Sequence, residues 1–325
     1  MRISIALATC NGAAYLEGQI KSILNGSRKP DEWVVVDDAS TDGSLELARS
    51  LLNAAGAPGV SVMANPRNIG ASASFVNAVA RTTGDVILFC DQDDLWHPDK
   101  LKRIEEAFAA DGSLVLAYHD GEIIDASGMH VSRTIWGTRK HALLAKGCDR
   151  DPLEVAANPD TKGCTMAIQG SFAREVFART PGGFHRYWGH DHWAALFAWG
   201  SGHVRALPEH LIQHRLHGRN TSAGTRFNPF APAHWKQRMR TARAQAPDHF
   251  VQRYAMAIAT ADRSPGFDAR LRAALQQHLI FAQRRMALRA AGPVKRCRSA
   301  FGLWRDGYYR DHANGVWTLL RDLAG

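Results

Sequence analysis

The chain has 325 residues, 45% of them hydrophobic and 22% charged, which suits one large domain with or without an appendage and excludes intrinsic disorder. The formal net charge of +9 is unevenly distributed, because residues 1–130 carry 10 Lys/Arg against 18 Asp/Glu and residues 131–325 carry 30 against 13. No apolar run reaches the roughly 18 residues that span a bilayer, so the sequence predicts a soluble protein or one bound at most to a membrane surface.

The first 130 residues alternate short apolar runs with helical patterns. Strands are predicted at Ile3–Ala8, Trp33–Val36, Val60–Met63, Val86–Cys90 and Leu114–Tyr118. A helix is expected after each of the first three strands, and this alternation predicts an α/β fold with a mostly parallel sheet between layers of helices. Ligands bind such sheets at the carboxyl ends of the strands. The polar residues that follow the strands are therefore expected to converge on one edge: Thr9, Asn11, Asp37, Asp38, Asn68, Asp91 and Asp93.

The second half of the chain is less regular. Residues 126–163 are rich in loop signals, and helical periodicity returns from His234, with Gly292-Pro293 separating two helices. From His234 to the C-terminus, 17 Lys/Arg stand against 6 Asp/Glu, interleaved with aromatic residues. Basic amphipathic helices of this kind either pack on the rest of the chain or lie on an anionic membrane surface, and the sequence leaves both interpretations open.

The run Asp91-Gln92-Asp93-Asp94 is the strongest functional signal. A buried strand delivers three carboxylates into one turn, where like charges repel unless a cation or strong hydrogen-bond donors compensate them. A hard divalent ion such as Mg²⁺ or Mn²⁺ prefers oxygen ligands and bridges to a diphosphate. The alternative is a solvated acidic turn in which Asp94 caps a helix.

Asp37-Asp38 repeats the arrangement at the second strand. A carboxylate there can accept hydrogen bonds from a nucleobase or a ribose, while Ser40 and Asp42 cap the next helix.

The five cysteines contain no CxxC pair, which predicts reduced thiols and neither a zinc site nor a disulfide framework. Seven histidines crowd residues 185–217, but without cysteine partners they do not predict zinc.

Several motifs resemble those of the family 2 glycosyltransferases of the GT-A fold. In the N-terminal half they are Thr9-x-Asn11-Gly12, Val36-Asp37-Asp38-x-Ser40-x-Asp42, Asn68-x-Gly70 and Asp91-Gln92-Asp93-Asp94-x-Trp96. Three later motifs are similar to those of bacterial rhamnosyltransferase-type members, namely Gly163-Cys164-Thr165-Met166, His190-Asp191-His192-Trp193 and Arg215-Leu216-His217-Gly218-Arg219-Asn220. The resemblance implies a GT-A catalytic domain over residues 1–225, with a nucleotide-sugar-binding part at 1–125 and an acceptor and catalytic part at 126–225. A basic helical region would fill 226–325.

The resemblance also implies roles for individual residues. Thr9 and Asp38 would contact the nucleoside, with Asp38 reading the pyrimidine, and Asp91 would lie near the ribose. Asp93 and His217 would hold the metal ion. The remaining donor-site residues would be Asn11, Asn68, Gly70 and Arg215, with Arg215 and Arg219 next to the pyrophosphate.

Asp191 would be the general base of an inverting, one-step displacement. The acceptor hydroxyl must lose its proton as it attacks, and apolar and aromatic neighbours predict a raised pKa for this carboxylate. The alternative is a buried carboxylate paired with His190 or Arg186. His190 stands where the wider family often has Glu, and His214 where the rhamnosyltransferase-type members commonly have Tyr, which bears on the fit of the acceptor.

The resemblance implies a nucleotide-sugar donor, dTDP-rhamnose in preference to a UDP-hexose, and a glycan or lipid-linked acceptor in surface polysaccharide assembly. The enzyme would act in the cytoplasm or on the inner face of the membrane.

Two other functions find less support in the sequence. A sugar nucleotidyltransferase would need a glycine-rich loop with Arg and Lys where this chain has Thr9-Cys10-Asn11-Gly12-Ala13. A nucleic-acid-binding protein is suggested only by the basic second half, and no zinc-finger, helix-turn-helix or RNA-binding signature supports it, so no nucleic-acid partner is expected.

Overall fold

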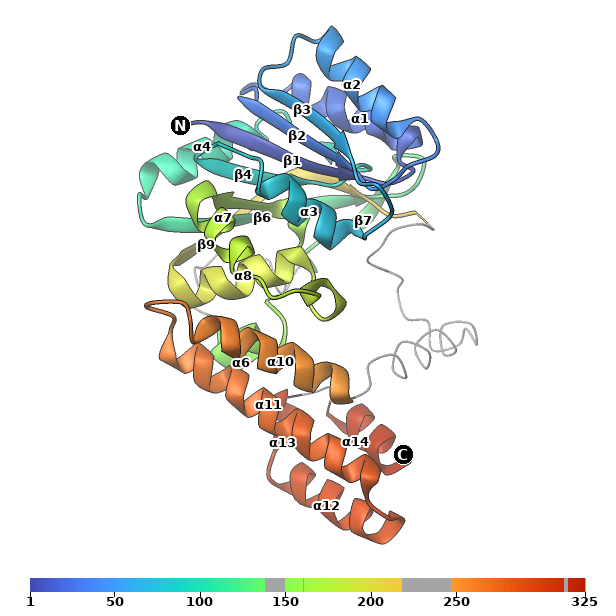
Figure 1. Ribbon diagram of the computed structural model, residues 1–325, viewed down its shortest axis with the longest axis vertical. Coiled ribbons are helices and arrows are strands. Elements are labelled where there is room, and N and C mark those ends of the chain that lie inside the picture. Colours follow the sequence, from blue (N-terminus) through green and yellow to red (C-terminus); the bar gives the residue numbers. More distant parts are fainter. Residues whose placement is uncertain (138–149, 160, 218–246, 313–314, 325) are drawn as a thin grey trace. The chain divides into compact units, whose positions relative to one another are not determined.

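A computed structural model describes residues 1–137, 150–159, 161–217, 247–312 and 315–324 (Figure 1). The chain forms two compact units, which are described separately. The first comprises Met1–Asp149, Asp160–Thr180 and Gly189–Ala223, and the second comprises Arg150–Pro159, Pro181–Trp188 and Gly224–Gly325. The domain boundary expected at residue 225 lies outside the described residues.

The described part of the first unit contains a nine-stranded sheet in the order β3-β2-β1-β4-β8-β6-β9-β5, with β7 paired to β6 (Figure 1). Its strands are β1 (Ile3–Thr9), β2 (Glu32–Asp37), β3 (Val60–Ala64), β4 (Val86–Cys90), β5 (Leu95–Trp96), β6 (Leu114–Ile124), β7 (His130–Thr134), β8 (Met166–Gln169) and β9 (His203–Arg215). Strands β1 to β4 are mutually parallel, and β6 runs parallel to β9, whereas β8 is antiparallel to both β4 and β6. The mostly parallel sheet is therefore confirmed.

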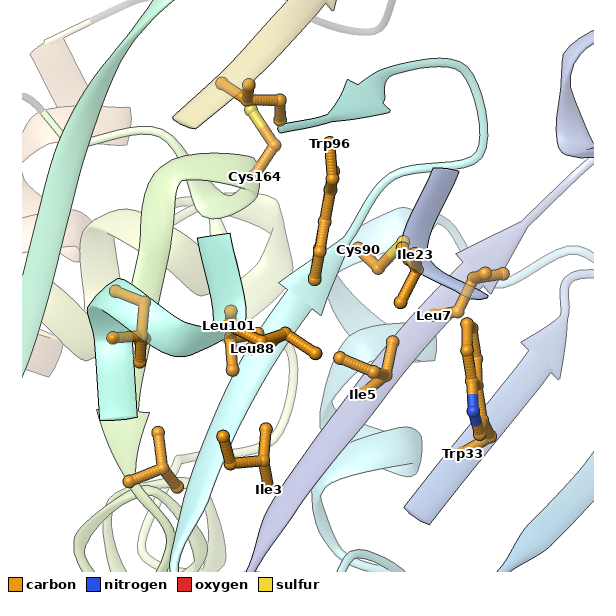
Figure 2. Packing of buried hydrophobic residues seen from close by; sticks show 14 of the residues in the cluster. Ile3, Ile5, Leu7, Ile23, Trp33, Leu88, Cys90, Trp96, Leu101 and Cys164 are labelled. Carbon is orange, nitrogen blue, oxygen red and sulfur yellow. The ribbon is translucent and has the colours of Figure 1, made fainter. Parts of the chain in front are cut away.

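Helices cover both faces of this sheet, which explains why β1, β2 and β4 are buried along their whole lengths. Alternate residues of β1 point to the same face, and Figure 2 shows Ile3, Ile5 and Leu7 packed with residues of β2, β4 and the covering helices. The helices on that face are α1 (Ala13–Leu24), α2 (Ser44–Ala54) and α4 (Lys100–Ala110). The opposite side carries α3 (Ala71–Val79), α7 (Gly170–Ala178) and α8 (His190–Ser201), and α3 contacts α7, α8, β1 and β2.

The predicted strands are all present, but β6 continues to Ile124, six residues beyond its predicted end. The long strand β9 had no sequence signal, because buried and exposed residues do not alternate regularly along it and polar side chains interrupt it. Within the stretch expected to be loop, the structure forms β7 and the helix α6 (Pro152–Ala157). Strand β9 matters for the site, since it ends at Arg215 beside the turn that follows β4.

The second unit is helical in its described residues. Besides α6 it contains the short 3₁₀ helix η2 (Phe184–Arg186) and the helices α10 (Pro247–Ala261), α11 (Ala269–Ala290), α12 (Pro293–Arg305), α13 (Tyr308–His312) and α14 (Val316–Ala324). The break predicted at Gly292-Pro293 is confirmed, because α11 ends at Ala290 and Pro293 opens α12. The buried guanidinium of Arg285 binds both carboxylate oxygens of Asp322, at 2.7 and 2.9 Å, and so ties α11 to α14. None of the helices that the structure describes is both long enough and apolar enough to span a membrane.

Candidate functional site

A cavity of about 390 Å³ opens at the carboxyl ends of β1, β2 and β4. Six of the residues predicted to bind the donor line it: Thr9, Asp38, Asn68, Gly70, Asp91 and Asp93. They come from four separate loops, which supports the expectation that the polar residues after the strands converge. Asn11 and Arg215 are not among the lining residues, and their contacts show why.

Asn11 joins two loops beneath the cavity. Its side-chain oxygen accepts a hydrogen bond from the Thr41 N–H at 2.9 Å, and its own N–H donates to Ser40 Oγ at 2.8 Å. Asn11 has a φ of 49°, and Ala39 in the second loop has a φ of 58°, a conformation that costs energy for any residue with a Cβ. The loops after β1 and β2 therefore hold each other in strained conformations at the edge of the cavity.

The carboxylate of Asp38 organises the loop that precedes α3. It accepts hydrogen bonds from the backbone N–H groups of Ile69 at 2.9 Å and Gly70 at 2.8 Å, and from Asn65 Nδ2 at 2.8 Å. Gly70 adopts a φ of 88°, in the region that favours glycine. Asp42, one residue before the N-cap Gly43 of α2, accepts from the Ser44 N–H at 3.1 Å, whereas the Ser40 hydroxyl, also expected to cap this helix, accepts from the Asn11 N–H.

Gln92 contributes contacts that sequence reasoning missed. Its side-chain oxygen accepts from Thr9 Oγ1 at 2.7 Å and from the Cys10 N–H at 2.8 Å, and its amide nitrogen donates to the Cys10 carbonyl at 3.3 Å. The loops after β1 and β4 are thereby bound together on the cavity wall. The signal that could have found Gln92 was its place between Asp91 and Asp93 in the motif.

The acidic turn after β4 is largely buried, and its carboxylates repel one another. Burial, together with the charges of Asp94 and Asp93, raises the pKa of Asp91 to about 8, and burial and Asp94 also raise the pKa of Asp93. Asp94 is 0% exposed, and its pKa lies below the usual value because the charge and hydrogen bond of His214 and the Arg215 N–H outweigh burial. The alternative of a solvated turn is therefore wrong.

His217 meets Asp93 directly. The distance from His217 Nε2 to Asp93 Oδ2 is 2.7 Å, across 124 residues of sequence, and the imidazole stacks on the Tyr15 ring with centroids 4.9 Å apart. Arg215 binds the same turn, because its Nε donates a hydrogen bond to the Asp93 carbonyl at 2.8 Å. In this structure the Arg215 side chain thus supports the acidic turn, while Arg219 lies outside the described residues.

Asp191 lies in the first turn of α8. Its carboxylate accepts from the His192 N–H at 2.8 Å and from the Gly163 N–H at 3.2 Å. The expectation of a raised pKa is wrong: burial raises the pKa of Asp191, but the imidazoles of His190 and His192 and the two N–H groups outweigh it and lower the pKa. Asp191 is near enough to the acidic turn for its charge to contribute to the raised pKa of Asp91.

His190 serves packing. Its ring stacks on Phe75 with centroids 4.1 Å apart and makes an edge contact with Phe89 at 5.0 Å. No hydrogen bond joins it to Asp191 in the part of the chain that the structure describes. The interaction of Asp191 with His190 that the sequence left open is therefore electrostatic, since the His190 imidazole lowers the pKa of Asp191.

A second group of side chains lies beneath the acidic turn. His214 Nδ1 is 2.9 Å from Asp94 Oδ1 and 3.9 Å from Cys164 Sγ, and the ligand atoms of Asp94, Cys164 and His214 all fall within 4.8 Å of one another. Such a trio could hold a metal ion, so a cysteine partner for histidine exists here that the sequence did not reveal. Burial, together with the charges of Asp94 and Asp91, raises the pKa of the Cys164 thiol well above its ordinary value, so an ion bound here would have to displace the thiol proton.

Lys100 is also part of this buried region. It is 0% exposed, its ammonium group donates to the Cys164 carbonyl at 2.7 Å, and it lies 3.7 Å from the centroid of the Trp96 ring. Burial lowers its pKa to about 8. Nothing in the sequence distinguished this lysine from a surface residue at the start of a helix.

Comparison with known proteins agrees with this arrangement. The model of glycosyl transferase family 2 matches residues 4–151. An uncharacterized glycosyltransferase of Nostoc is 30% identical over 222 residues, which are 68% of this chain and 66% of the relative. The dTDP-rhamnosyl transferase RfbG of Shigella flexneri is 32% identical over 106 residues, 30% of this chain and 34% of the relative. The chain thus spans less than two thirds of the length of these relatives.

The fold is shared with solved glycosyltransferase structures. The mannosyltransferase PcManGT of Pyrobaculum calidifontis, in complex with GDP-Man and Mn²⁺, superposes with a TM-score of 0.54 at 19% identity, covering 99% of this chain and 85% of that one. At this identity the likeness shows the GT-A architecture alone. Taken with the family model and the cavity at the carboxyl ends of the parallel strands, it leads to one conclusion: the chain belongs to glycosyl transferase family 2.

Proposed function

We propose that the protein is an inverting glycosyltransferase that moves a sugar from a nucleotide diphosphate donor in the cavity to the hydroxyl group of an acceptor. The observation that carries the proposal is the 2.7 Å contact between His217 and Asp93, beside a cavity that Asp91 and Asp93 line. Residues from distant parts of the sequence supply a carboxylate and an imidazole at the same point. A carboxylate and an imidazole placed together can hold a divalent ion beside a leaving diphosphate.

Asp93 and His217 fit a divalent ion better than the buried trio does. Mg²⁺ and Mn²⁺ prefer carboxylate oxygen, with imidazole as an acceptable further ligand for Mn²⁺. The trio of Asp94, Cys164 and His214 offers a protonated thiol, and the nearby Lys100 ammonium disfavours a second cation. We assign Asp93 and His217 as the protein ligands of the ion, which when bound would stabilise the negative charge of the departing diphosphate.

Asp191 is our candidate for the general base. A lowered pKa keeps its carboxylate ionised at neutral pH, ready to accept the proton of an acceptor hydroxyl. The two N–H groups from His192 and Gly163 fix its orientation. A single positioned base suffices for a direct displacement, which inverts the anomeric centre.

The remaining donor-site roles are those that the resemblance implies, and the residues that line the cavity support them. Thr9 and Asp38 are assigned to the nucleoside, Asp91 to the ribose, and Asn68 and Gly70 to the rim. Because protein donors already hold both Asp38 oxygens, any contact of Asp38 with a pyrimidine uses the remaining lone pairs. Asn11 and Arg215 act by holding the loops and the acidic turn in place.

The preferred donor is dTDP-rhamnose, supported by the similarity to the Shigella dTDP-rhamnosyl transferase, with a UDP-hexose as the alternative. The assignment of a divalent ion, Mn²⁺ or Mg²⁺, gains support from the Mn²⁺ in the Pyrobaculum structure. The acceptor is a glycan or a lipid-linked saccharide of surface polysaccharide assembly. The cytoplasmic location stays a prediction.

A donor screen tests this function. Binding of dTDP-rhamnose, UDP-hexoses and GDP-mannose is measured by calorimetry, with and without Mn²⁺ or Mg²⁺, and release of the nucleoside diphosphate is followed in the same samples. We expect one donor to bind more tightly with the metal ion and to release its nucleotide slowly to water. If no nucleotide sugar binds in any metal condition, the proposal is rejected. Production of pyrophosphate would indicate a nucleotidyltransferase instead.

A further inference from the structure

We infer that the outer faces of α12 and α14, termed the α12–α14 face, bind an anionic membrane surface. The residues of this face are Val294, Lys295, Arg298, Phe301, Trp304 and Arg305 on α12, and Val316, Trp317 and Leu320 on α14. Membrane binding itself is independent of the catalytic activity. Its purpose, delivery of the enzyme to a lipid-linked acceptor, rests on the proposed function.

The exposed apolar side chains of α12 form a stripe. Val294 is 86% exposed, Phe301 62% and Trp304 46%. They are seven and three residues apart, which places them within about 80° of one another around a helix with 3.6 residues per turn. Ala300 and Leu303 point elsewhere, into the core of the unit, so the stripe is not a part of that core.

Helix α14 adds a second patch. Val316, Trp317 and Leu320 are each at least half exposed, whereas Thr318 and Asp322 on the opposite side are buried. Helices α12 and α14 contact each other, and Figure 1 shows both near the C-terminal end of α11. Among the described residues of the whole chain, every exposed Phe or Trp side chain lies on these two helices. Isolated exposed apolar residues are ordinary, but aromatic residues concentrated in this way mark an interaction surface.

The structure therefore separates the aromatic residues of the C-terminal region into a buried and an exposed group. Of the aromatic residues that the C-terminal region contains, Tyr254, Phe281 and Tyr309 are buried inside the second unit, and Phe301, Trp304 and Trp317 are exposed. The first group packs the appendage, and the second group lies exposed at its surface.

The charge of α12 favours an anionic surface as the partner of the α12–α14 face. The helix contains Lys295, Arg296, Arg298 and Arg305 and no acidic residue. By helical position Arg298 and Arg305 border the apolar stripe, and both are exposed; Arg305 Nε also lies 3.2 Å from the carboxylate of Asp306, which follows the helix. Two copies of the chain pairing through this face would bring the basic residues of both together, which is unfavourable. An anionic bilayer complements the basic border, and its interface accommodates Trp and Phe side chains.

Vesicle co-sedimentation of the full chain tests the inference. The vesicles contain either phosphatidylcholine alone or equal amounts of phosphatidylcholine and phosphatidylglycerol. We expect binding to the anionic vesicles that weakens with added salt. The aromatic variant Phe301→Ser/Trp304→Ser and the charge variant Arg298→Glu/Arg305→Glu should each bind at least about tenfold more weakly. The matched control Arg49→Glu/Arg81→Glu reverses two exposed charges on α2 and just after α3 and should bind like the wild type.

Two further measurements separate the explanations. Sedimentation equilibrium shows whether the aromatic variant changes the oligomeric state. A changed oligomeric state with unaltered vesicle binding would mean that the α12–α14 face joins copies of the chain. That result would overturn the inference. Wild-type binding by both α12 variants would overturn it as well. Nucleotide release without vesicles reports on catalysis alone. Vesicle binding by a protein that uses no donor therefore refutes the proposed function and leaves the membrane surface in place.

Discussion

The ammonium group of Lys100 donates a hydrogen bond to the carbonyl oxygen of Cys164 across 2.7 Å, in a region closed to solvent. Cys164 belongs to the short 3₁₀ helix η1 (Gly163–Thr165), and the N–H of Gly163 in the same turn binds Asp191. Lys100 thus connects the helix that follows the acidic turn to the segment that orients the candidate base. Its charge also offsets those of Asp91 and Asp94, which both influence its pKa.

Replacing this lysine should therefore destabilise the protein. Lys100→Met leaves the buried Cys164 carbonyl without its partner and removes the cation that compensates the acidic turn, with an expected loss of about 2–4 kcal/mol in the free energy of unfolding. Urea denaturation measures the loss. The neighbouring Lys102 is exposed, and Lys102→Met should change the free energy by less than about 0.5 kcal/mol. Equal stability of the two variants would show that Lys100 has no structural role.

The His217→Ala variant tests the metal site. Because His217 is one of two proposed protein ligands, its loss should weaken Mn²⁺ binding at least about tenfold and lower kcat/KM at limiting metal concentration. Calorimetric titration with Mn²⁺ measures the affinity, and excess Mn²⁺ should restore part of the activity. The exposed His185 serves as the control, since His185→Ala should leave both quantities unchanged. Unaltered Mn²⁺ affinity in His217→Ala would exclude this residue as a ligand.

Asp191→Asn should separate binding from chemistry. The amide keeps the size of the side chain but cannot accept the proton of the acceptor, so kcat should fall by about 10²–10⁴-fold while the donor Kd stays constant. Steady-state kinetics and donor calorimetry measure the two quantities. The exposed Asp262 provides an Asp262→Asn control with wild-type kinetics. Should Asp191→Asn instead weaken donor binding and leave kcat intact, another group must serve as the base.

The acidic turn makes the stability of the metal-free protein depend on pH. The pKa of Asp91 is about 8 in the folded protein and near 4 when unfolded, so between these values the folded state holds the proton more tightly. The free energy of unfolding should therefore fall as the pH rises from about 4 to about 8, by a few kcal/mol, since the cavity side of the carboxyl group stays in contact with water.

Urea denaturation at several pH values, in the presence of a chelator, follows this trend. Asp91→Asn removes the titrating group and should flatten the profile, and saturating Mn²⁺ should also reduce the slope because the ion compensates the carboxylates. A wild-type profile that rises over the same interval would contradict the buried, mutually repelling arrangement of Asp91, Asp93 and Asp94.

The sequence by itself determined the first four strands of the sheet and the acidic turn. Mostly apolar runs of four to six residues between helical patterns predicted β1 to β4, since a parallel strand covered on both faces is apolar at most positions; β1, β2 and β4 are buried throughout, whereas the edge strand β3 is half-buried. The polar residues that end these strands were predictable for the same reason, because the carboxyl ends of parallel strands share one edge of the sheet. Five of them indeed line one cavity: Thr9, Asp38, Asn68, Asp91 and Asp93.

Only the tertiary structure decided how the remaining groups act. The resemblance implied that His217 lies beside Asp93, but strand β9 has no regular alternation, so the burial of His214 against Asp94 was not visible in the sequence. The pKa of Asp191 was predicted in the wrong direction, because its apolar neighbours were weighed above the adjacent imidazoles of His190 and His192, which lower it, and because the N–H of Gly163, 28 residues away, was not visible. Local spacing specifies strands and helices, but charge compensation depends on distances that only the packed chain sets. Lys100 is the clearest case, a lysine with no distinguishing sequence pattern that packing places in the core beneath the site.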